Sequence, residues 1–564
     1  MEYKMQFGSI NAKQKTNTNS KVFRIAVLGD FSGKGNSGRV EIGDALLARK
    51  PLRVTHENLD SILARLDVHL KLPAGASGAM IDVPIKQLDD FHPDQLFANV
   101  PLFEKLVSLR KKLQDSATFD KAAAAVRSLA GSGAVSTIPA ARAKSQSNSV
   151  PRGRIESFAD LIQSDTRENV EPELKTLMRD VVSQHVVPEM HGQAELIAAV
   201  DESLSDLMRK LLHHPDFQAL ESLWRSLDML IHRLELDHEL EVVLYDINAS
   251  EFAADLAAVD ALENSGIYKW LIDAPSMDAA QGALSMLVCN FVFEQIPPHA
   301  ELLARAAKIG AAANAPIIAA VDCSFLKKTA PEDLHPLIVE SWNSLRQLPE
   351  SAYLALTTPR FMLRWPFGKK TEPINSFKFE EFTPRSGLSG MLWGNAAFIA
   401  GLVIAQTFRD QGLASMNLGS ILTVGDIPFY FYTDADGDQV ALPCTERLVN
   451  VRTAQHVTSQ GLIPTISMQG SPDVRLGGLH SIAGVPLAGA WAPVSINSQS
   501  DLKPISEQPS FATPANQPEM TETPSSSPSA DDDLDNLLAS LDAPNEPSTD
   551  SGLDADLEAL LADL

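Results

Sequence analysis

The chain has 564 residues, which is more than one hydrophobic core usually supports, and about two or three folded units are therefore expected. Its formal net charge of −25 argues against nucleic acid as a partner, because neutralising phosphates requires a surplus of Lys and Arg. Hydrophobic residues make up 44% of the chain, enough for sizeable cores, yet the apolar stretches fall short of the roughly 20 residues that a membrane span needs.

The amino terminus and the cysteines predict a cytoplasmic location. The first residues lack the charged-then-apolar order of a secretory signal. Cys289, Cys323 and Cys444 are far apart and have neither disulfide nor metal-ligand spacing, so we expect them to be buried as small hydrophobic side chains. All of this fits a reducing compartment.

Residues 1–20 predict an N-terminal arm, in which residues 5–10 follow the pattern of a detachable strand and a frayed terminus is the alternative. Strand and helix patterns then alternate over residues 21–129, which is typical of a small α/β unit. Thr55 is expected to cap a helix, and the residues after Pro101 carry apolar side chains at helical spacing. The predicted elements are strands over 22–28, 52–54, 68–72 and 81–85 and helices over 59–66 and 102–113.

Residues 130–153 are rich in Gly, Ser, Ala and Pro without any apolar period, as in a linker. A larger unit over residues 154–496 follows. Pro215 can begin one of its helices, because the first turn does not use the missing N–H. The predicted elements are helices over 207–212, 215–231 and 300–313, strands over 241–247, 283–293 and 316–321, and a hairpin over 429–442.

Residues 497–564 predict a disordered acidic tail, because their composition cannot bury enough apolar area to offset chain entropy. Residues 501–564 hold fifteen Asp and Glu against one Lys, and therefore −14 of the net charge of −25. Two short helical motifs, 533–541 and 556–564, place leucines on one face and would fold only in the groove of a partner. The candidate partner-binding residues are Leu534, Leu537, Leu538, Leu541, Leu557, Leu560, Leu561 and Leu564.

The glycine-rich run over residues 29–35 follows a strand, as a phosphate-binding loop would. Its spacing differs, because three residues rather than four separate the first two glycines, and Gly35 stands where Ser or Thr should follow the lysine. The run therefore predicts a structural turn.

Two further patterns suggest metal binding but fit it poorly. Asp434, Asp436 and Asp438 resemble a calcium loop, but the glycine comes too early and a hairpin turn is favoured. His213 and His214 are adjacent at a helix junction, so they point in different directions, and capping or packing is expected. We predict no catalytic residue, no cofactor-binding or metal-binding residue, and no enzymatic activity.

Residues 211–227 have the sequence Leu-Leu-His-His-Pro-Asp-Phe-Gln-Ala-Leu-Glu-Ser-Leu-Trp-Arg-Ser-Leu. This run closely resembles a signature of the large contractile-sheath subunit of type VI secretion systems, TssC or VipB. Further similarities to that family follow in order over residues 200–207, 306–320, 345–368, 377–381 and 392–395.

The first unit resembles the small sheath subunit, TssB or VipA, which is normally a separate chain. The similarities lie over residues 27–33, 57–60, 90–96, 100–102 and 109–113. Together the two resemblances imply an α/β, mixed-sheet sheath-type fold formed jointly by a small N-terminal unit and a larger unit, with the acidic tail appended.

The resemblance also implies a function. It predicts a structural component of a type VI secretion contractile sheath, which assembles by strand exchange into a cytoplasmic tube. The implied partners are copies of itself or sheath subunits, the inner tube, baseplate proteins and a Clp-type unfoldase, to which the family presents a helix near residues 155–162. The alternative is a sheath-fold accessory protein that caps or tethers the sheath through its acidic tail.

Overall fold

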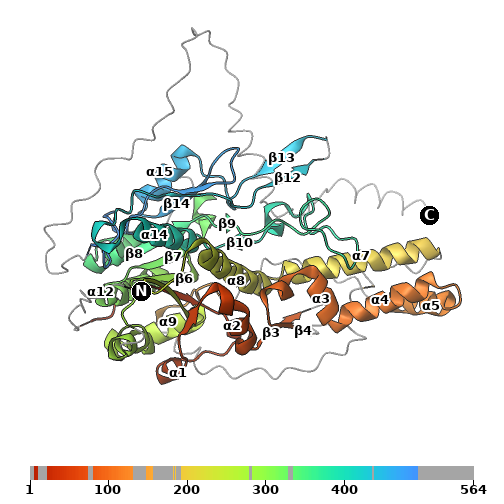
Figure 1. Cartoon of the computed structure of the whole chain (residues 1–564), viewed down its shortest axis with the longest axis horizontal. Helices are drawn as coiled ribbons and strands as arrows, with labels where there is room; N and C mark the ends of the chain where they lie inside the picture. Colours follow the sequence, from red (N-terminus) through yellow and green to blue (C-terminus); the bar gives the residue numbers. More distant parts are fainter. Residues whose placement is uncertain are drawn as a thin grey trace, which may run out of the picture.

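The fold is that of a computed structural model (Figure 1). The structure describes residues 5–10, 22–73, 80–130, 148–155, 182, 185, 192–278, 282–327, 335–434 and 437–492. Most of the predicted linker and the whole predicted acidic tail lie outside these residues. No helix in the described ranges combines the length and apolarity that crossing a bilayer requires.

A nine-stranded sheet runs through the described part of the chain, in the order β11-β15-β14-β8-β7-β6-β1-β5-β2. The strands from β14 to β5 are parallel, while β2 at one edge and β15 and β11 at the other are antiparallel to their neighbours. This mixed sheet confirms the predicted fold class. The strands of the sheet are β1 (Phe23–Gly29), β2 (Leu52–Val54), β5 (Leu240–Asp246), β6 (Met286–Phe293), β7 (Ile317–Val321), β8 (Leu354–Thr358), β11 (Thr423–Val424), β14 (Ile463–Ser467) and β15 (Val474–Leu476).

The small and the large unit build this sheet together. β1 lies between β5 and β6 and pairs in parallel with both, so a strand from the N-terminal unit stands inside the sheet of the larger one. Its seven residues are all buried. Phe23, Ile25 and Val27 belong to one core cluster, whereas Ala26 and Leu28 belong to another, as the two-residue period of a strand requires.

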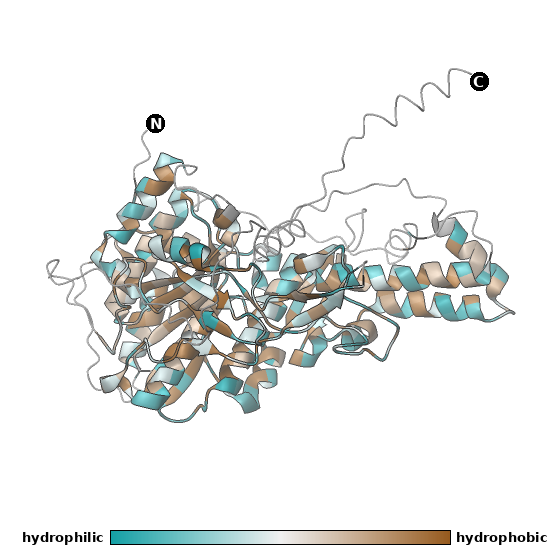
Figure 2. Ribbon diagram, turned by 90° about the horizontal axis from the view of Figure 1, so that it is seen from above, coloured by the Kyte–Doolittle hydropathy of each residue, from teal (hydrophilic) through white to brown (hydrophobic). Residues whose placement is uncertain are grey.

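Helices cover both faces of the sheet, and hydrophobic residues gather on the central strands (Figure 2). α8 and α14 pack into the first core cluster, and α9 and α12 pack into the second. The helices are α1 (Asp44–Leu47), α2 (Leu59–Leu66), α3 (Pro93–Asn99), α4 (Pro101–Gln114), α5 (Phe119–Ala130), α7 (Gln193–Leu212), α8 (Pro215–Arg233), α9 (Ala249–Ala257), α10 (Gly266–Tyr268), α11 (Ala274–Met277), α12 (Pro297–Ala313), α13 (Pro336–Arg346), α14 (Ala397–Gln411) and α15 (Val451–Ser459).

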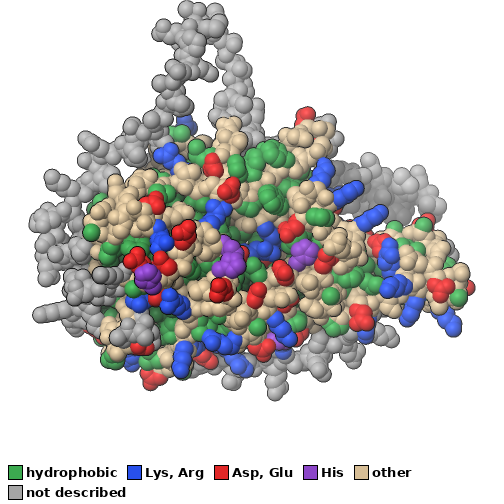
Figure 3. Space-filling view, viewed as in Figure 1, with side chains coloured by type: hydrophobic (Ala, Val, Ile, Leu, Met, Phe, Trp, Pro, Cys, Tyr) green, Lys and Arg blue, Asp and Glu red, His purple; other side chains and the backbone are tan. Residues whose placement is uncertain are grey.

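A helical projection formed by α4, α5 and α7 extends from one end of the molecule (Figures 1 and 2). Its basic side chains are visible at that end in Figure 3, and Lys111 and Lys112 are among the exposed residues of α4. The predicted apolar face of this helix is confirmed, because its buried residues are those expected from helical spacing. They are Leu102, Phe103, Leu106, Leu109 and Leu113.

Three small two-stranded sheets accompany the large one. The predicted alternating strands pair as β3 (Val68–Pro73) with β4 (Met80–Ile85), and the predicted hairpin is β12 (Tyr430–Thr433) with β13 (Gln439–Leu442). The third sheet pairs β9 (Phe361–Met362) with β10 (Trp393–Gly394).

The strand expected over residues 283–293 begins later, at Met286. Just before it, Ser285 exchanges two hydrogen bonds with Arg24: the Ser285 N–H donates to the carbonyl, and the Arg24 N–H donates to the Ser285 hydroxyl. The Ser285 hydroxyl thereby accepts the N–H of Arg24, which a backbone carbonyl would accept if the strand continued.

Candidate assembly interface

The contact between the two units centres on Trp224 of α8. Its indole N–H donates to the carbonyl of Phe31, just after β1, at 3.1 Å, and its ring meets the Phe31 ring edge-on with centroids 5.2 Å apart. Both side chains are fully buried. A second edge-on aromatic pair joins the two units, between Phe91 and Phe217, which precedes Trp224 on α8. The two units therefore share a core rather than a solvated boundary.

The glycine-rich run after β1 is a structural turn, as predicted. The Asp30 carboxylate accepts the backbone N–H groups of Lys34 and Gly35, each at 2.8 Å. These N–H groups are the donors that a phosphate-binding loop would offer to a phosphate, and here Asp30 occupies them. Burial and the nearby Asp246 raise the pKa of Asp30 to about 8. Ser32 donates its N–H to Asp246 at 3.0 Å and ties the turn to β5.

An arginine from the small unit enters the large unit beside this turn. The Arg49 guanidinium donates to both carboxylate oxygens of Glu251, at 2.9 and 2.5 Å, and to the carbonyl of Asp246 at 2.7 Å. Burial opposes the charge of Arg49, but its hydrogen bonds to Glu251 raise its pKa. In return, the Trp270 indole N–H donates to the Arg49 carbonyl at 2.9 Å.

Residues 90–96, one of the segments that carry the resemblance of the first unit, also contact the large unit. Asp94 at the start of α3 accepts the N–H of Asn375, the N–H of Ser376 at 2.9 Å and the Ser376 hydroxyl at 2.6 Å. Burial opposes ionisation, but these hydrogen bonds lower the pKa of Asp94. Farther out, Arg110 of α4 forms a bidentate ion pair with Asp201 of α7.

A buried ion network within the large unit supports the same region. Arg364 donates to Glu221 of α8 at 2.7 Å and to Glu381 at 2.7 Å, and its guanidinium lies 4.1 Å from the centre of the Phe367 ring. Arg364 is 6% exposed, and the two carboxylates are 0% and 1% exposed. Burial opposes ionisation of Glu381, yet the charges of Arg364 and His213 lower its pKa to about 2.

The N-terminal arm is seated on α12 through its backbone. The Gln6 N–H donates to Glu301 at 3.1 Å, and its carbonyl accepts from Arg305 at 3.1 Å. Lys308 donates to the carbonyl of Gly8 at 2.8 Å. Ser9 forms a parallel bridge with Ala261, in which its N–H reaches the Asp260 carbonyl and its carbonyl accepts the Leu262 N–H. All of these hydrogen bonds use backbone atoms of the arm.

The arm does not form the continuous strand expected over residues 5–10. Gly8 has a φ of 64°, a left-handed conformation that interrupts the extended backbone, so Ser9 makes a single bridge. A Cβ at Gly8 would lie 3.2 Å from the Leu262 side chain. Phe7 and Ile10 nevertheless pack against the core cluster that includes α12.

The predicted roles of the aspartates and histidines agree with the structure. Asp434 and Asp438 close the β12–β13 hairpin, where the Asp438 N–H donates to the Asp434 carboxylate at 2.9 Å; Asp436 lies outside the described residues. His214 caps α8 by accepting the Asp216 N–H. His213 lies 3.5 Å from Glu381 and completes the buried network.

The eight leucines named as candidate partner-binding residues, in 533–541 and 556–564, lie outside the described residues, as do residues 156–162 of the segment near the unfoldase helix. The residues of α12 that hold the arm were not predicted from the sequence. The sequence did contain a signal for them, because Glu301, Arg305 and Lys308 follow at helical spacing on a helix otherwise rich in Ala and Leu.

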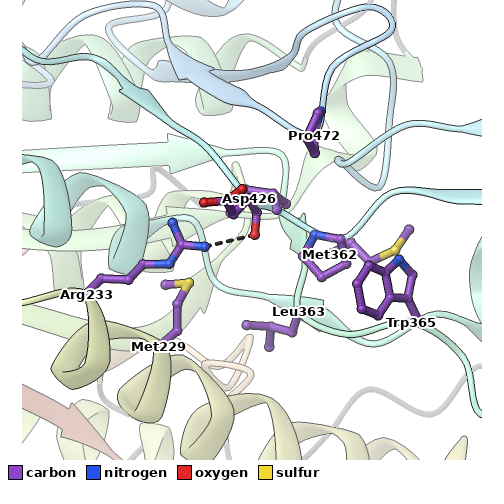
Figure 4. Close-up of a pocket in the computed structure, with 9 residues that line it drawn as sticks. Met229, Arg233, Met362, Leu363, Trp365, Asp426 and Pro472 are labelled. Carbon is purple, nitrogen blue, oxygen red and sulfur yellow. Dashed lines mark hydrogen bonds between the residues drawn. The ribbon is translucent and has the colours of Figure 1, made fainter. Parts of the chain in front are cut away.

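A mostly apolar hollow of about 390 Å³ opens between α8 and the strand β9 (Figure 4). Arg233 lies at its side and donates to the carbonyls of Gly425 and Asp426, at 2.6 and 2.8 Å. Trp365 is about half exposed at its rim. The lining residues are Met229, Arg233, Met362, Leu363, Trp365, Asp426, Ile427, Pro428 and Pro472.

Comparison with known proteins accounts for both units. Residues 194–483 match the VipB family, described as the EvpB-type tail sheath N-terminal domain, and residues 3–129 match the VipA family of the type VI secretion system. The type VI secretion system sheath protein TssC1 of Pseudomonas aeruginosa PAO1 is 30% identical over 334 residues, which cover 56% of this chain and 67% of that protein. The chain thus belongs to the type VI secretion sheath family, as a structural protein and not an enzyme, with a VipA-type and a VipB-type unit in one polypeptide.

Proposed function

We propose that this sheath component assembles with copies of itself, or with other sheath subunits, into a cytoplasmic tube by exchanging backbone segments. The observation that carries the proposal is the seating of residues 5–10, which are held through backbone atoms by Glu301, Arg305 and Lys308. Contacts of this kind can be made equally by the same segment of a neighbouring copy, because they use backbone atoms rather than particular side chains of the arm.

The proposal includes three further partners. An inner tube protein would lie inside the sheath, baseplate proteins would nucleate it, and a Clp-type unfoldase would disassemble it. The support for these partners is membership of the sheath family.

Negative-stain electron microscopy of the purified chain tests the proposal. The full chain is expected to form tubes, and deletion of residues 1–10 is expected to reduce their number at least tenfold, because the exchanged segment is gone. Lys111→Ala, on the exposed face of α4, is the matched control and should leave the tubes unchanged. A full chain that stays monomeric and forms no tubes would contradict the proposal.

A second candidate function is an accessory protein that caps or tethers a sheath through its acidic tail. The repeated leucine spacing of residues 533–541 and 556–564 favours it. In that case the chain would remain monomeric and bind sheath ends or a baseplate component, and removal of residues 531–564 would abolish the binding.

A further inference from the structure

We propose that the seat of the N-terminal arm is a self-occluded receptor. Residues 5–10 of the same chain occupy the contacts on α12 and on residues 260–262 that the arm of a second copy would use, so the resident arm must leave before assembly begins. Because exchange between copies is itself proposed above, the regulatory part of this idea rests on that function.

The seat recognises backbone, and it is built before the arm arrives. Arg305 is fully buried, and its Nη1 donates to the carbonyls of Leu256 and Val259 at 2.7 and 2.6 Å, which fixes the guanidinium independently of the arm. The segment opposite is held by its own turn, in which the Ser265 N–H donates to the Leu262 carbonyl at 3.1 Å. A preformed receptor loses little entropy when it binds.

The occupant is identified by one glycine. Gly8 is left-handed, and the place of its missing Cβ lies 3.2 Å from the Leu262 side chain and 3.3 Å from the Asp260 carbonyl. A segment with this backbone conformation is therefore accommodated best when it carries glycine at that position. The arm itself has this glycine, which favours the arm of this chain or of a second copy as the occupant.

The resident arm can leave without unfolding the body. None of residues 5–10 is fully buried, and Ser9 is exposed, whereas every residue of β1 is buried. Opening of such a segment is local, because it breaks a few backbone bonds and the packing of Phe7 and Ile10. Covalent geometry lets residues 11–21 span up to about 40 Å, so an undocked arm can search well beyond its own seat.

Peptide binding tests the occlusion in solution. The probe is a synthetic peptide of residues 1–12 with a fluorophore at its carboxyl end, measured by anisotropy against the full chain and against a variant lacking residues 1–10. A tethered arm acts at an effective concentration of the order of millimolar. With a peptide Kd of about 10–100 µM, the full chain should bind the peptide about 10- to 100-fold more weakly than the deletion variant.

Two controls keep this measurement decisive. A peptide carrying Gly8→Val, or an N-methyl group on the Gln6 amide, should not bind either protein. The Gly8→Val substitution in the full chain should displace the resident arm and raise the affinity for the peptide to that of the deletion variant. It replaces the deletion variant as the test if deletion of residues 1–10 prevents folding. Equal peptide affinity in the full chain and both variants would overturn the occlusion, and so would a folded deletion variant that binds no peptide.

A covalent lock tests the consequence for assembly. Ser9 and Ala261 are bridge partners on adjacent backbone segments, so Ser9→Cys with Ala261→Cys is designed to lock the arm in its own seat when oxidised. Tubes should form from the reduced protein and not from the oxidised one, while Ser9→Cys alone should form them in both states. Equal assembly in both states of the double variant overturns the proposal. If the reduced protein also fails to assemble, the proposed function has failed, and the peptide measurement still decides the occlusion.

Discussion

Replacing Trp224 with alanine is expected to lower the free energy of unfolding by about 3–5 kcal/mol, among the largest effects of any single substitution in this chain. The change removes a fully buried side chain from the contact between the two units and leaves a cavity there. It also leaves the buried Phe31 carbonyl without its 3.1 Å donor. The measurement is the midpoint of denaturant-induced unfolding, followed by intrinsic fluorescence and circular dichroism.

Two further substitutions separate packing from hydrogen bonding at this position. Trp224→Phe keeps most of the ring but loses the N–H, and should cost about 1–2 kcal/mol. Trp365→Ala is the matched control, because that tryptophan is about half exposed, and its midpoint should move far less. A Trp224→Ala variant no less stable than Trp365→Ala would show that the two units do not share a core.

Replacing Arg364 with methionine is expected to cost about 3–5 kcal/mol at neutral pH. Methionine fills a similar volume but removes the guanidinium that bridges the two buried carboxylates, which leaves Glu221 with Arg225 and Glu381 with His213 as their remaining partners. Arg409→Met removes ion pairs with Asp237 and Glu235 that solvent screens, and should change the stability far less. Thermal unfolding of the two variants beside the parent protein makes the comparison.

The pH dependence of this variant gives a second test. In the parent protein the pKa of Glu381 is lowered to about 2, so its contribution to stability is complete above the ordinary carboxyl pKa and is lost as the pH falls through about 2. Without Arg364, burial dominates and favours the protonated acid. The stability difference between variant and parent should therefore shrink as the pH falls from 7 towards 4.

A rescue variant completes the experiment. Adding Glu221→Gln and Glu381→Gln to Arg364→Met removes the two buried charges that have lost their shared cation while keeping acceptor oxygens, and should recover at least half of the lost stability. A constant deficit at every pH, with no recovery in the triple variant, would mean that the network matters for packing alone.

Elements with a strong local pattern were predicted well from the sequence. The apolar stripe of α8 and the face of α4 follow the helical period, and β3 and β4 alternate buried and exposed residues as expected. These patterns report which side of an element is buried, which is a local property. Pro215 begins α8 for a different local reason, because the first turn of a helix does not use the N–H that proline lacks.

Features that depend on distant residues were not predicted in detail. No local pattern shows that β1 inserts between β5 and β6, because its partners are more than 200 residues away. The buried charges of Arg364 and Glu221 were missed, since charged residues are normally exposed and become recognisable only when their partners are placed. Of the candidate site, the N-terminal arm was predicted from the sequence, and the residues of α12 that hold it were not.

The two units hold each other through the shared sheet and do not depend on the connection between them. Inserting a site for a specific protease between residues 131 and 147 of the full chain and cleaving it tests this directly. Size-exclusion chromatography in native buffer should return both fragments in one peak at the elution volume of the uncut protein, with separation only in denaturant. Two separate peaks in native buffer would show that the two units do not hold together without the connection.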